Sequence, residues 1–384
     1  MNKKRIQKYK SAISSVLQCD EKKIFLYWKG RIALYAFLKS LELKDGDEVI
    51  IPAFTCVVVP NAILYANLKP IYVDITSETY NMDVHQLEKS ITNKTKVIIC
   101  QNTFGLSSNI EAIIALAQKY NLYTIEDCTH GFGGFYNGKP NGSYCDAAFY
   151  STQWNKPFST GIGGFLVVNN KSLLDRIFAL EAIKIKPKLI ERSVLRFLLS
   201  FRKLFVNKYT QSFLVKIYRF LSQHNLTLGS NRGEELNSIS MPINYYKDIS
   251  NVQINEGIKS LKNISQLNEL RKKNAYEYTK YLKSKNKNHV GENTFSNHIF
   301  LKYPLLVKNR DVFFERAEKF NITLGDWFLS PLHPIKGDLN KWNFDREKFP
   351  IADSLSRKIV NLPTDIKNSN EVIKFLELNL ELIE

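Results

Sequence analysis

Between residues 47 and 127, short apolar runs rich in valine and isoleucine alternate with longer stretches that have helical apolar spacing. The runs are 47–52, 69–75, 96–100 and 122–127, and the helical stretches between them are 55–66, 84–91 and 110–120. Strands that alternate with helices in this way form mostly parallel sheets packed between helices. The sequence therefore predicts an α/β fold with a mostly parallel central sheet.

Four polar residues follow the carboxyl ends of these predicted strands, where ligands bind in sheets of this kind. They are Thr55, Asn102, Asp127 and His130. Asp127 ends the run LYTIED, and a buried carboxylate is costly unless it has a partner. A helix N-terminus or a lysine would be an ordinary partner. The alternative is the protonated ring nitrogen of a bound cofactor, which a carboxylate would hold in its charged form.

The stretch 149–169, FYSTQWNKPFSTGIGGFLVVN, contains a lysine in a glycine-rich loop. Apolar runs flank the loop, so two more strands are predicted with Lys156 between them. A lysine in a turn is ordinarily a solvated surface residue, and only the polar strand ends upstream favour a chemical role. Gly30 precedes a further helical stretch, 31–43, whose first amide groups would be free to bind an anion with the help of Arg31. A capped surface helix explains that stretch equally well.

The net charge of +17 is far from zero and indicates an anionic partner. Residues 171–220 contain twelve lysine or arginine residues against three acidic ones, mixed with leucine and phenylalanine. This segment is either a set of helices with a solvated basic face or an amphipathic face that contacts an anionic membrane. No nucleic-acid reader motif accompanies the charge, so we expect no nucleic acid partner.

No apolar run reaches the roughly 20 residues that a spanning helix needs, and the first residues lack the apolar core of a secretion signal. We therefore expect a cytoplasmic protein, with peripheral contact at the inner face of the membrane as an open alternative. The five cysteines are widely spaced and form no C-x-x-C pair. We expect reduced thiols and no metal site.

Composition also divides the chain into two predicted domains. The polar stretch 225–250, rich in asparagine and serine, is typical of a crossing between domains. The predicted large domain is 1–245, with a basic helical insertion at 171–240. Residues 246–384 form the predicted smaller domain, of α+β class, which begins with one long or two broken helices at 254–281.

Seven segments occur together in the order found in one protein family. They are GRIAL (30–34), GDEVIIPAFTCVVVPNAI (46–63), PIYVDITSETYNMD (70–83), IEDCTHGFGG (125–134), FYSTQWNKPFSTGIGG (149–164), SPLHP (330–334) and FPIADSLSRKIVNLP (349–363). By these segments the chain resembles the DegT/DnrJ/EryC1/StrS family of nucleotide-sugar aminotransferases, which depend on pyridoxal 5'-phosphate (PLP). The resemblance implies the fold of aspartate aminotransferase, PLP-transferase fold type I. It covers the chain from about residue 30 onward, and only the region 171–240 matches poorly.

The resemblance implies roles for the residues that match the family's motifs. Lys156 would bind the cofactor as a Schiff base and later move a proton. Asp127 would keep the pyridine nitrogen protonated, and His130 would lie near the ring oxygen. Ser151, with the backbone at Gly30 and Arg31, would hold the phosphate group.

The chain departs from the family's pattern at several of the implied cofactor contacts. Arg31 stands where most members carry threonine, and an arginine also binds phosphate well. Cys56, next to Thr55, stands where many members place an aromatic ring on the cofactor, so Phe54 or Phe104 would have to supply that ring. Asn244 resembles the asparagine that reaches the phosphate across a dimer interface, although Tyr246 stands where an arginine usually follows.

The function implied by the resemblance is amino transfer in a homodimer with shared active sites. The donor is expected to be glutamate, and the acceptor a nucleotide-linked keto-sugar destined for surface polysaccharide, with Trp327 and His333 near the substrate. Family members that dehydrate sugars replace the lysine with histidine, so Lys156 favours amino transfer. Two alternatives stay open: a PLP enzyme acting on another keto substrate, such as one attached to lipid, and a non-catalytic binding or regulatory module.

Overall fold

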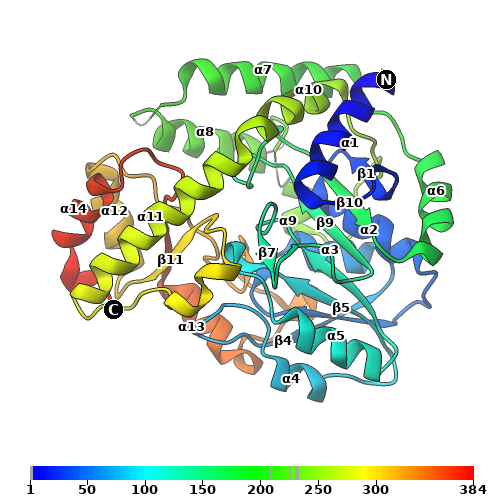
Figure 1. The fold of residues 1–384 in the computed structure, drawn as a ribbon, viewed down its shortest axis with the longest axis horizontal. Helices are drawn as coiled ribbons and strands as arrows, with labels where there is room; N and C mark the ends of the chain where they lie inside the picture. The colour runs from blue at the N-terminus through cyan, green and yellow to red at the C-terminus, as the bar shows by residue number, and fades with distance from the viewer. Residues whose placement is uncertain (1–2, 208, 225, 230–232) are drawn as a thin grey trace.

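The computed structural model describes residues 3–207, 209–224, 226–229 and 233–384 (Figure 1). Lys208, one of the basic residues of the 171–220 segment, lies outside the described residues. At the centre is a seven-stranded sheet in the order β1-β10-β9-β6-β5-β2-β4. Its strands are β1 (Ile24–Tyr27), β2 (Glu48–Pro52), β4 (Lys69–Val73), β5 (Thr95–Gln101), β6 (Tyr123–Asp127), β9 (Ala147–Ser151) and β10 (Gly164–Val168). All neighbours from β4 to β9 are parallel, which confirms the predicted mostly parallel sheet.

The central strands are buried on both faces, because alternate side chains enter two apolar layers. Val49 and Ile51 of β2 pack in the layer of two helices, and Ile50 packs in the layer of two others. The first pair is α2 (Gly30–Ser40) and α3 (Val58–Tyr65), and the second is α4 (Val84–Lys89) and α5 (Ile110–Lys119). Burial on both faces is why these strands are continuous apolar runs in the sequence and not alternating ones.

The N-terminal residues cover one edge of the sheet. β1 pairs antiparallel with β10, which itself pairs antiparallel with β9. The helix before it, α1 (Lys3–Leu17), buries Tyr9, Ile13 and Leu17 against the sheet and against α10 (Asn251–Ser260). Figure 1 shows α1 and α10 together beside this edge.

A second apolar core lies in the C-terminal third of the chain. It forms between α11 (Ile264–Ser284), β11 (Tyr303–Leu306), α12 (Arg310–Lys319), β13 (Ile359–Leu362) and α14 (Asn370–Glu377). The predicted helical stretch 254–281 is therefore broken, since α10 packs on the large sheet and α11 supports the second core. The division into 1–245 and 246–384 stays a prediction.

One part of this C-terminal region returns to the large sheet. Phe328, Leu332, Trp342 and Phe344 are buried in the same core as α2 and α3. Here β12 (Leu332–His333) pairs in parallel with β3 (Thr55–Cys56), so two segments nearly 280 residues apart become neighbours.

The region 171–240 folds as helices that lie outside the central sheet (Figure 1). They are α6 (Leu174–Ala182), α7 (Leu189–Phe205), α8 (Gln211–Gln223) and the short α9 (Gly233–Asn237). Within the described residues, no helix combines the length and the apolar character needed to cross a membrane.

Candidate active site

The loop between β9 and β10 is fastened at its base and presents Lys156. Thr152 and Gly163 are joined by a backbone hydrogen bond of 2.9 Å, and the Thr152 and Thr160 hydroxyls lie 2.6 Å apart. A Cβ atom on Gly163 would come within 2.3 Å of the Thr152 hydroxyl oxygen, so only glycine fits there. Because these contacts close the loop at both ends, residues 153–159 project from the sheet, with Lys156 at the centre of the loop.

Lys156 is a partly buried lysine with a weakly held proton. Burial lowers its pKa to about 8, although Asp127 and Cys56 act in the opposite direction. The described residues place no carboxylate within ion-pair distance of its Nζ atom, which lies 4.4 Å from the centre of the Trp327 ring. A lysine of this kind is neutral in a useful fraction of molecules near neutral pH and is a good nucleophile.

Asp127 lies at the carboxyl end of β6, the strand next to the one that leads to Lys156. Its side chain is buried, and Oδ1 accepts a hydrogen bond from the Thr129 backbone N–H at 2.9 Å. Burial raises the pKa of this carboxyl group, whereas hydrogen bonding from the Thr129 side chain and backbone and the nearby Lys156 lower it. A buried carboxylate in this position is suited to accept an N–H from a cationic ring.

His130 and Trp327 form a flat wall beside the lysine. Their rings are parallel within 2° with centres 4.5 Å apart, and His130 is buried. His130 Nδ1 accepts the Phe104 backbone N–H at 3.2 Å, so the neutral ring carries its proton on Nε2. Burial and Lys156 hold the pKa of His130 well below its usual range. The wall therefore offers a neutral N–H donor next to a broad aromatic face.

Trp327 is also the aromatic ring nearest to the Lys156 amine. Phe54 and Phe104, which the sequence suggested in place of an aromatic at Cys56, pack edge to face against each other at 6.4 Å. Cys56 itself pairs in register with His333 across β3 and β12. Sequence reasoning placed Trp327 with the substrate but gave no reason to expect it against Lys156.

The first turn of α2 lies against the end of β9, as a phosphate seat requires. A Cβ atom on Gly30 would be 2.8 Å from the Tyr150 carbonyl oxygen and 2.9 Å from Ser151 Cβ. Gly30 is thus what lets the helix N-terminus approach Ser151, whose side chain is buried. Among the described residues the Ser151 hydroxyl has no hydrogen bond within the chain.

An anionic side chain already lies at this end of α2. The carboxylate of Glu235, on α9, binds Arg31 Nη1 at 2.6 Å and Lys29 Nζ at 3.2 Å. All three side chains are nearly inaccessible to solvent. The donors therefore hold a carboxylate where the family resemblance predicts a phosphate group. Sequence reasoning missed both Lys29 and Glu235.

Four other predicted residues have less direct positions. Thr55 donates to Gln101 Oε1 at 2.5 Å, at the carboxyl end of the sheet. Asn102 Nδ2 donates a hydrogen bond of 2.7 Å to Glu126 Oε1, so the Asn102 amide stabilises the end of the sheet and is not available to a ligand through that group. His333 is buried, with its pKa lowered to about 4 mainly by that burial. Asn244 is exposed, with φ of +58°, and does not join the site within one chain.

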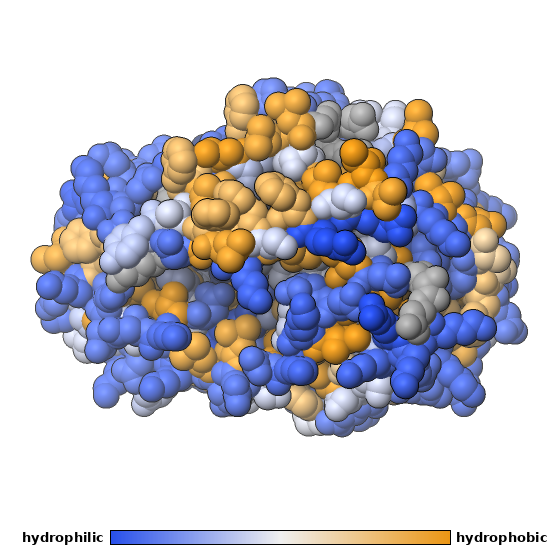
Figure 2. Space-filling view, turned by 90° about the horizontal axis from the view of Figure 1, so that it is seen from above, coloured by the Kyte–Doolittle hydropathy of each residue, from blue (hydrophilic) through white to orange (hydrophobic). Residues whose placement is uncertain are grey.

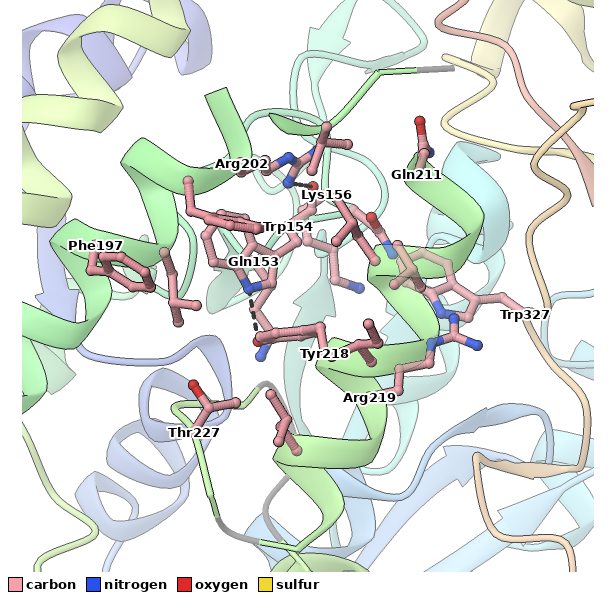
Figure 3. A pocket seen from close by; sticks show the side chains of 18 residues that line it. Gln153, Trp154, Lys156, Phe197, Arg202, Gln211, Tyr218, Arg219, Thr227 and Trp327 are labelled. Carbon is pink, nitrogen blue, oxygen red and sulfur yellow. Dashed lines mark hydrogen bonds between the residues drawn. The ribbon is translucent and has the colours of Figure 1, made fainter. Parts of the chain in front are cut away.

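A pocket of about 430 Å³ opens between α7 and α8 and ends at Lys156 (Figure 3). Trp154 and Tyr218 lie on one side, joined by a hydrogen bond of 2.8 Å from the indole N–H to the phenol oxygen. On the other side Arg219 binds Asp326 through two hydrogen bonds, of 2.7 and 3.0 Å, and so ties α8 to the residue before Trp327. The sequence contained no signal for these pairs, because their partners are 64 and 107 residues apart.

Known proteins match this chain along most of its length. The sequence pattern of the DegT/DnrJ/EryC1/StrS aminotransferase family matches residues 28–195 and 211–375. The GDP-perosamine synthase of Escherichia coli O157:H7 is 44% identical over 147 residues, which are 38% of this chain and 40% of that protein. The match thus spans less than half of that relative's length.

Two further proteins match over longer stretches. The dTDP-3-amino-3,6-dideoxy-alpha-D-galactopyranose transaminase of Aneurinibacillus thermoaerophilus is 27% identical over 349 residues, which are 90% of this chain and 81% of that protein. Among solved structures, Streptococcus pneumoniae Spr1654 in its PLP form has a TM-score of 0.71 and 19% identity, over 98% of this chain and 90% of that one. This likeness confirms the predicted fold class.

Proposed function

The chain belongs to the DegT/DnrJ/EryC1/StrS aminotransferase family, and from this premise we propose that it is a PLP-dependent aminotransferase. Its donor is an amino acid, which we take to be glutamate, and its acceptor is a keto-sugar. Relatives whose names include GDP-perosamine and a dTDP-linked amino sugar make a nucleotide the first candidate for the sugar's carrier. The product would be an amino sugar for a surface polysaccharide.

The observation that carries the proposal is the proximity of Lys156 and Asp127, each of which influences the pKa of the other. PLP has an aldehyde that captures amines and a protonated ring that draws electrons from the reacting carbon. Lys156 has the lowered pKa that attack on an aldehyde needs, and the same amine can carry a proton between two atoms of a bound ligand. Asp127 offers a buried carboxylate that could accept a ring N–H. A binding module would have no use for either property.

The residues at the end of α2 fit a phosphate group. Arg31 and Lys29 already hold a carboxylate, which is a smaller anion with the same need for cationic donors. The close approach of Gly30 to Ser151 brings the first backbone amides of α2 next to the Ser151 hydroxyl, and together they would bind the phosphate group. His130 would donate through Nε2 to an oxygen on the ring, and Trp327 would cover one face of the site.

We also propose that the enzyme is a cytoplasmic homodimer. Asn244 is exposed and in the left-handed conformation, as a residue that serves another subunit can be. The basic helices α7 and α8 carry exposed leucine and phenylalanine side chains, which supports peripheral contact with an anionic membrane.

A second acceptor is favoured by one observation, the apolar character of the pocket that leads to Lys156. A keto-sugar on a lipid carrier would use the same chemistry at Lys156 and differ only in what fills that pocket.

The proposal is tested by incubating the PLP-loaded protein with ¹⁵N-labelled glutamate and a panel of GDP-, UDP- and dTDP-linked keto-sugars. Mass spectrometry should find ¹⁵N in one sugar and 2-oxoglutarate in equal amount. The Lys156→Ala protein should form neither. If wild-type protein released no 2-oxoglutarate even in the half-reaction without an acceptor, the aminotransferase proposal would be wrong.

A further inference from the structure

The walls of the pocket above Lys156 expose mainly apolar surface, although Gln153, Asn155, Gln211 and Thr227 also line it. The apolar lining comes from α7 (Phe197, Leu198, Phe201) and from α8 (Leu214, Val215, Ile217, Leu221). Leucine, valine and phenylalanine side chains of this kind fit an apolar chain, which gains free energy by leaving water.

One cation lies at the pocket with unused donors. Arg202, on α7, stacks on the Trp154 ring at 5.2 Å and donates one hydrogen bond of 3.2 Å to the Trp154 carbonyl oxygen. Among the described residues no carboxylate lies within ion-pair distance of it, whereas Arg219 is paired with Asp326. A guanidinium in this state is suited to bind a phosphate group. Because Arg202 contacts Trp154, which is two residues before Lys156 in the loop, a phosphate group bound to Arg202 would lie near the lysine.

The apolar wall of the pocket continues onto the outer surface of the helices. Phe197 and Ile217 line the pocket and are also 64% and 40% exposed. Around them are further exposed apolar side chains: Leu189, Ile190, Leu204, Phe205, Phe213 and Phe220. Figure 2 shows hydrophobic residues gathered on the face seen from above, interrupted by strongly hydrophilic ones. A cluster of large exposed apolar side chains on one face marks an interaction site.

The charges on this face indicate what it meets. Arg196 and Lys203 are exposed among the apolar side chains of α7. A two-fold contact between two copies of this face would bring like charges together, which is unfavourable. An anionic lipid surface offers the complementary charge and an apolar interior.

We propose that the pocket between α7 and α8 binds the apolar chain of an anionic single-chain lipid, with its phosphate at Arg202, and that this lipid carries the keto-sugar acceptor. The inference rests on the proposed aminotransferase function for the sugar and for the chemistry at Lys156. The binding site for the apolar chain of the lipid follows from the pocket itself and does not depend on that function. The carrier delivers its sugar to Lys156 from the membrane side of the hairpin formed by α7 and α8.

The test uses PLP-loaded protein and farnesyl phosphate, a single isoprenoid chain with one phosphate group. Because Trp154 and Trp327 line the pocket, binding should change tryptophan fluorescence in a saturable way. Leu214→Glu places a charge in the apolar wall and should weaken binding by more than about tenfold. Leu198→Trp fills the same pocket without a charge and should also weaken binding. Leu378→Glu, at an exposed leucine that follows α14 and lies outside the pocket lining, is the matched control and should bind farnesyl phosphate as the wild type does.

Several outcomes would overturn the inference. They are the absence of a saturable change in fluorescence in the wild type, an equal loss of binding in Leu378→Glu and Leu214→Glu, and the same fluorescence change with inorganic phosphate alone. Tighter binding of dihexanoyl phosphatidylglycerol than of farnesyl phosphate would make the occupant a membrane phospholipid and refute the carrier role. The PLP absorption band and its response to glutamate, recorded on the same samples, report separately on the aminotransferase proposal.

Discussion

Two opposing influences act on the pKa of Lys156, and their balance sets the pH at which the site can act. Burial favours the neutral amine, whereas the Asp127 carboxylate favours the charged one, and burial prevails with a pKa of about 8. From the sequence, the partner of Asp127 was expected to be a helix N-terminus, a lysine or the ring nitrogen of a cofactor. In the structure Lys156 lies near enough to lower the pKa of Asp127, and Thr129 hydrogen-bonds to its carboxylate.

The rate of PLP capture by the cofactor-free protein should therefore depend on pH in a defined way. Because the neutral amine is the nucleophile, the rate should rise about tenfold per pH unit below pH 8 and become constant above it. With an ordinary lysine, whose pKa is 10.5, the rate would continue to rise up to that pH. Stopped-flow absorbance measures this rate. In Asp127→Asn the plateau should begin at a lower pH, since the charge that raises the pKa of Lys156 is gone. A plateau that began only near pH 10.5 in the wild type would refute the lowered pKa.

At the scale of elements, α9 and the N-terminus of α2 form a contact that PLP would have to replace if its phosphate group binds at the proposed seat. Glu235→Gln should lower the stability of the cofactor-free protein by about 3 kcal/mol, because Arg31 and Lys29 lose a buried anion. The same change should increase PLP affinity by about tenfold, because the phosphate no longer competes with a carboxylate. Thermal unfolding with and without PLP, together with a PLP titration, measures both. Weaker PLP binding in Glu235→Gln would show that the carboxylate assists the cofactor instead.

The packing of α2 on β9 gives a second prediction at this scale. Gly30→Ala should destabilise the protein by about 2 kcal/mol and weaken PLP binding, since the new methyl group meets the Tyr150 carbonyl oxygen and Ser151. Gly337→Ala is the control, because a Cβ atom there meets nothing within 4 Å. Chemical denaturation of both variants is the measurement, and equal stability of the two would contradict the role assigned to Gly30.

The elements themselves were largely predictable from the sequence, and their contacts were not. The strands from β2 to β6 are buried on both faces, so each is an apolar run, and strand ends such as Asp127 follow directly. Glu235 was not predictable because it lies 204 residues after Arg31, in a polar stretch without periodicity. The pocket was missed for the same reason, since the pattern of α7 and α8 shows two amphipathic helices but not which faces enclose Lys156.

At the scale of the whole molecule, the proposed dimer can be tested through Asn244. If Asn244 completes the partner's site, mixing and refolding inactive Lys156→Ala with Asn244→Ala should restore one intact site per mixed dimer. That site would take its lysine from one chain and its asparagine from the other, so activity should recover to about a quarter of the wild-type value. Asn286→Ala is a suitable control for Asn244→Ala, because Asn286 is also in the left-handed conformation but lies just beyond the C-terminal end of α11. No recovery on mixing would place Asn244 outside the shared site.

The central claim, that Lys156 and Asp127 make this chain an aminotransferase, is tested most directly by the visible absorption spectrum of the purified protein with PLP, before and after glutamate. We predict a yellow band that bleaches when glutamate is added and returns with 2-oxoglutarate. In Lys156→Ala no covalent adduct should survive borohydride reduction and denaturation, whereas the wild type should keep its label. A wild-type spectrum that never develops the band would contradict the account and favour a protein that has kept the fold as a binding module.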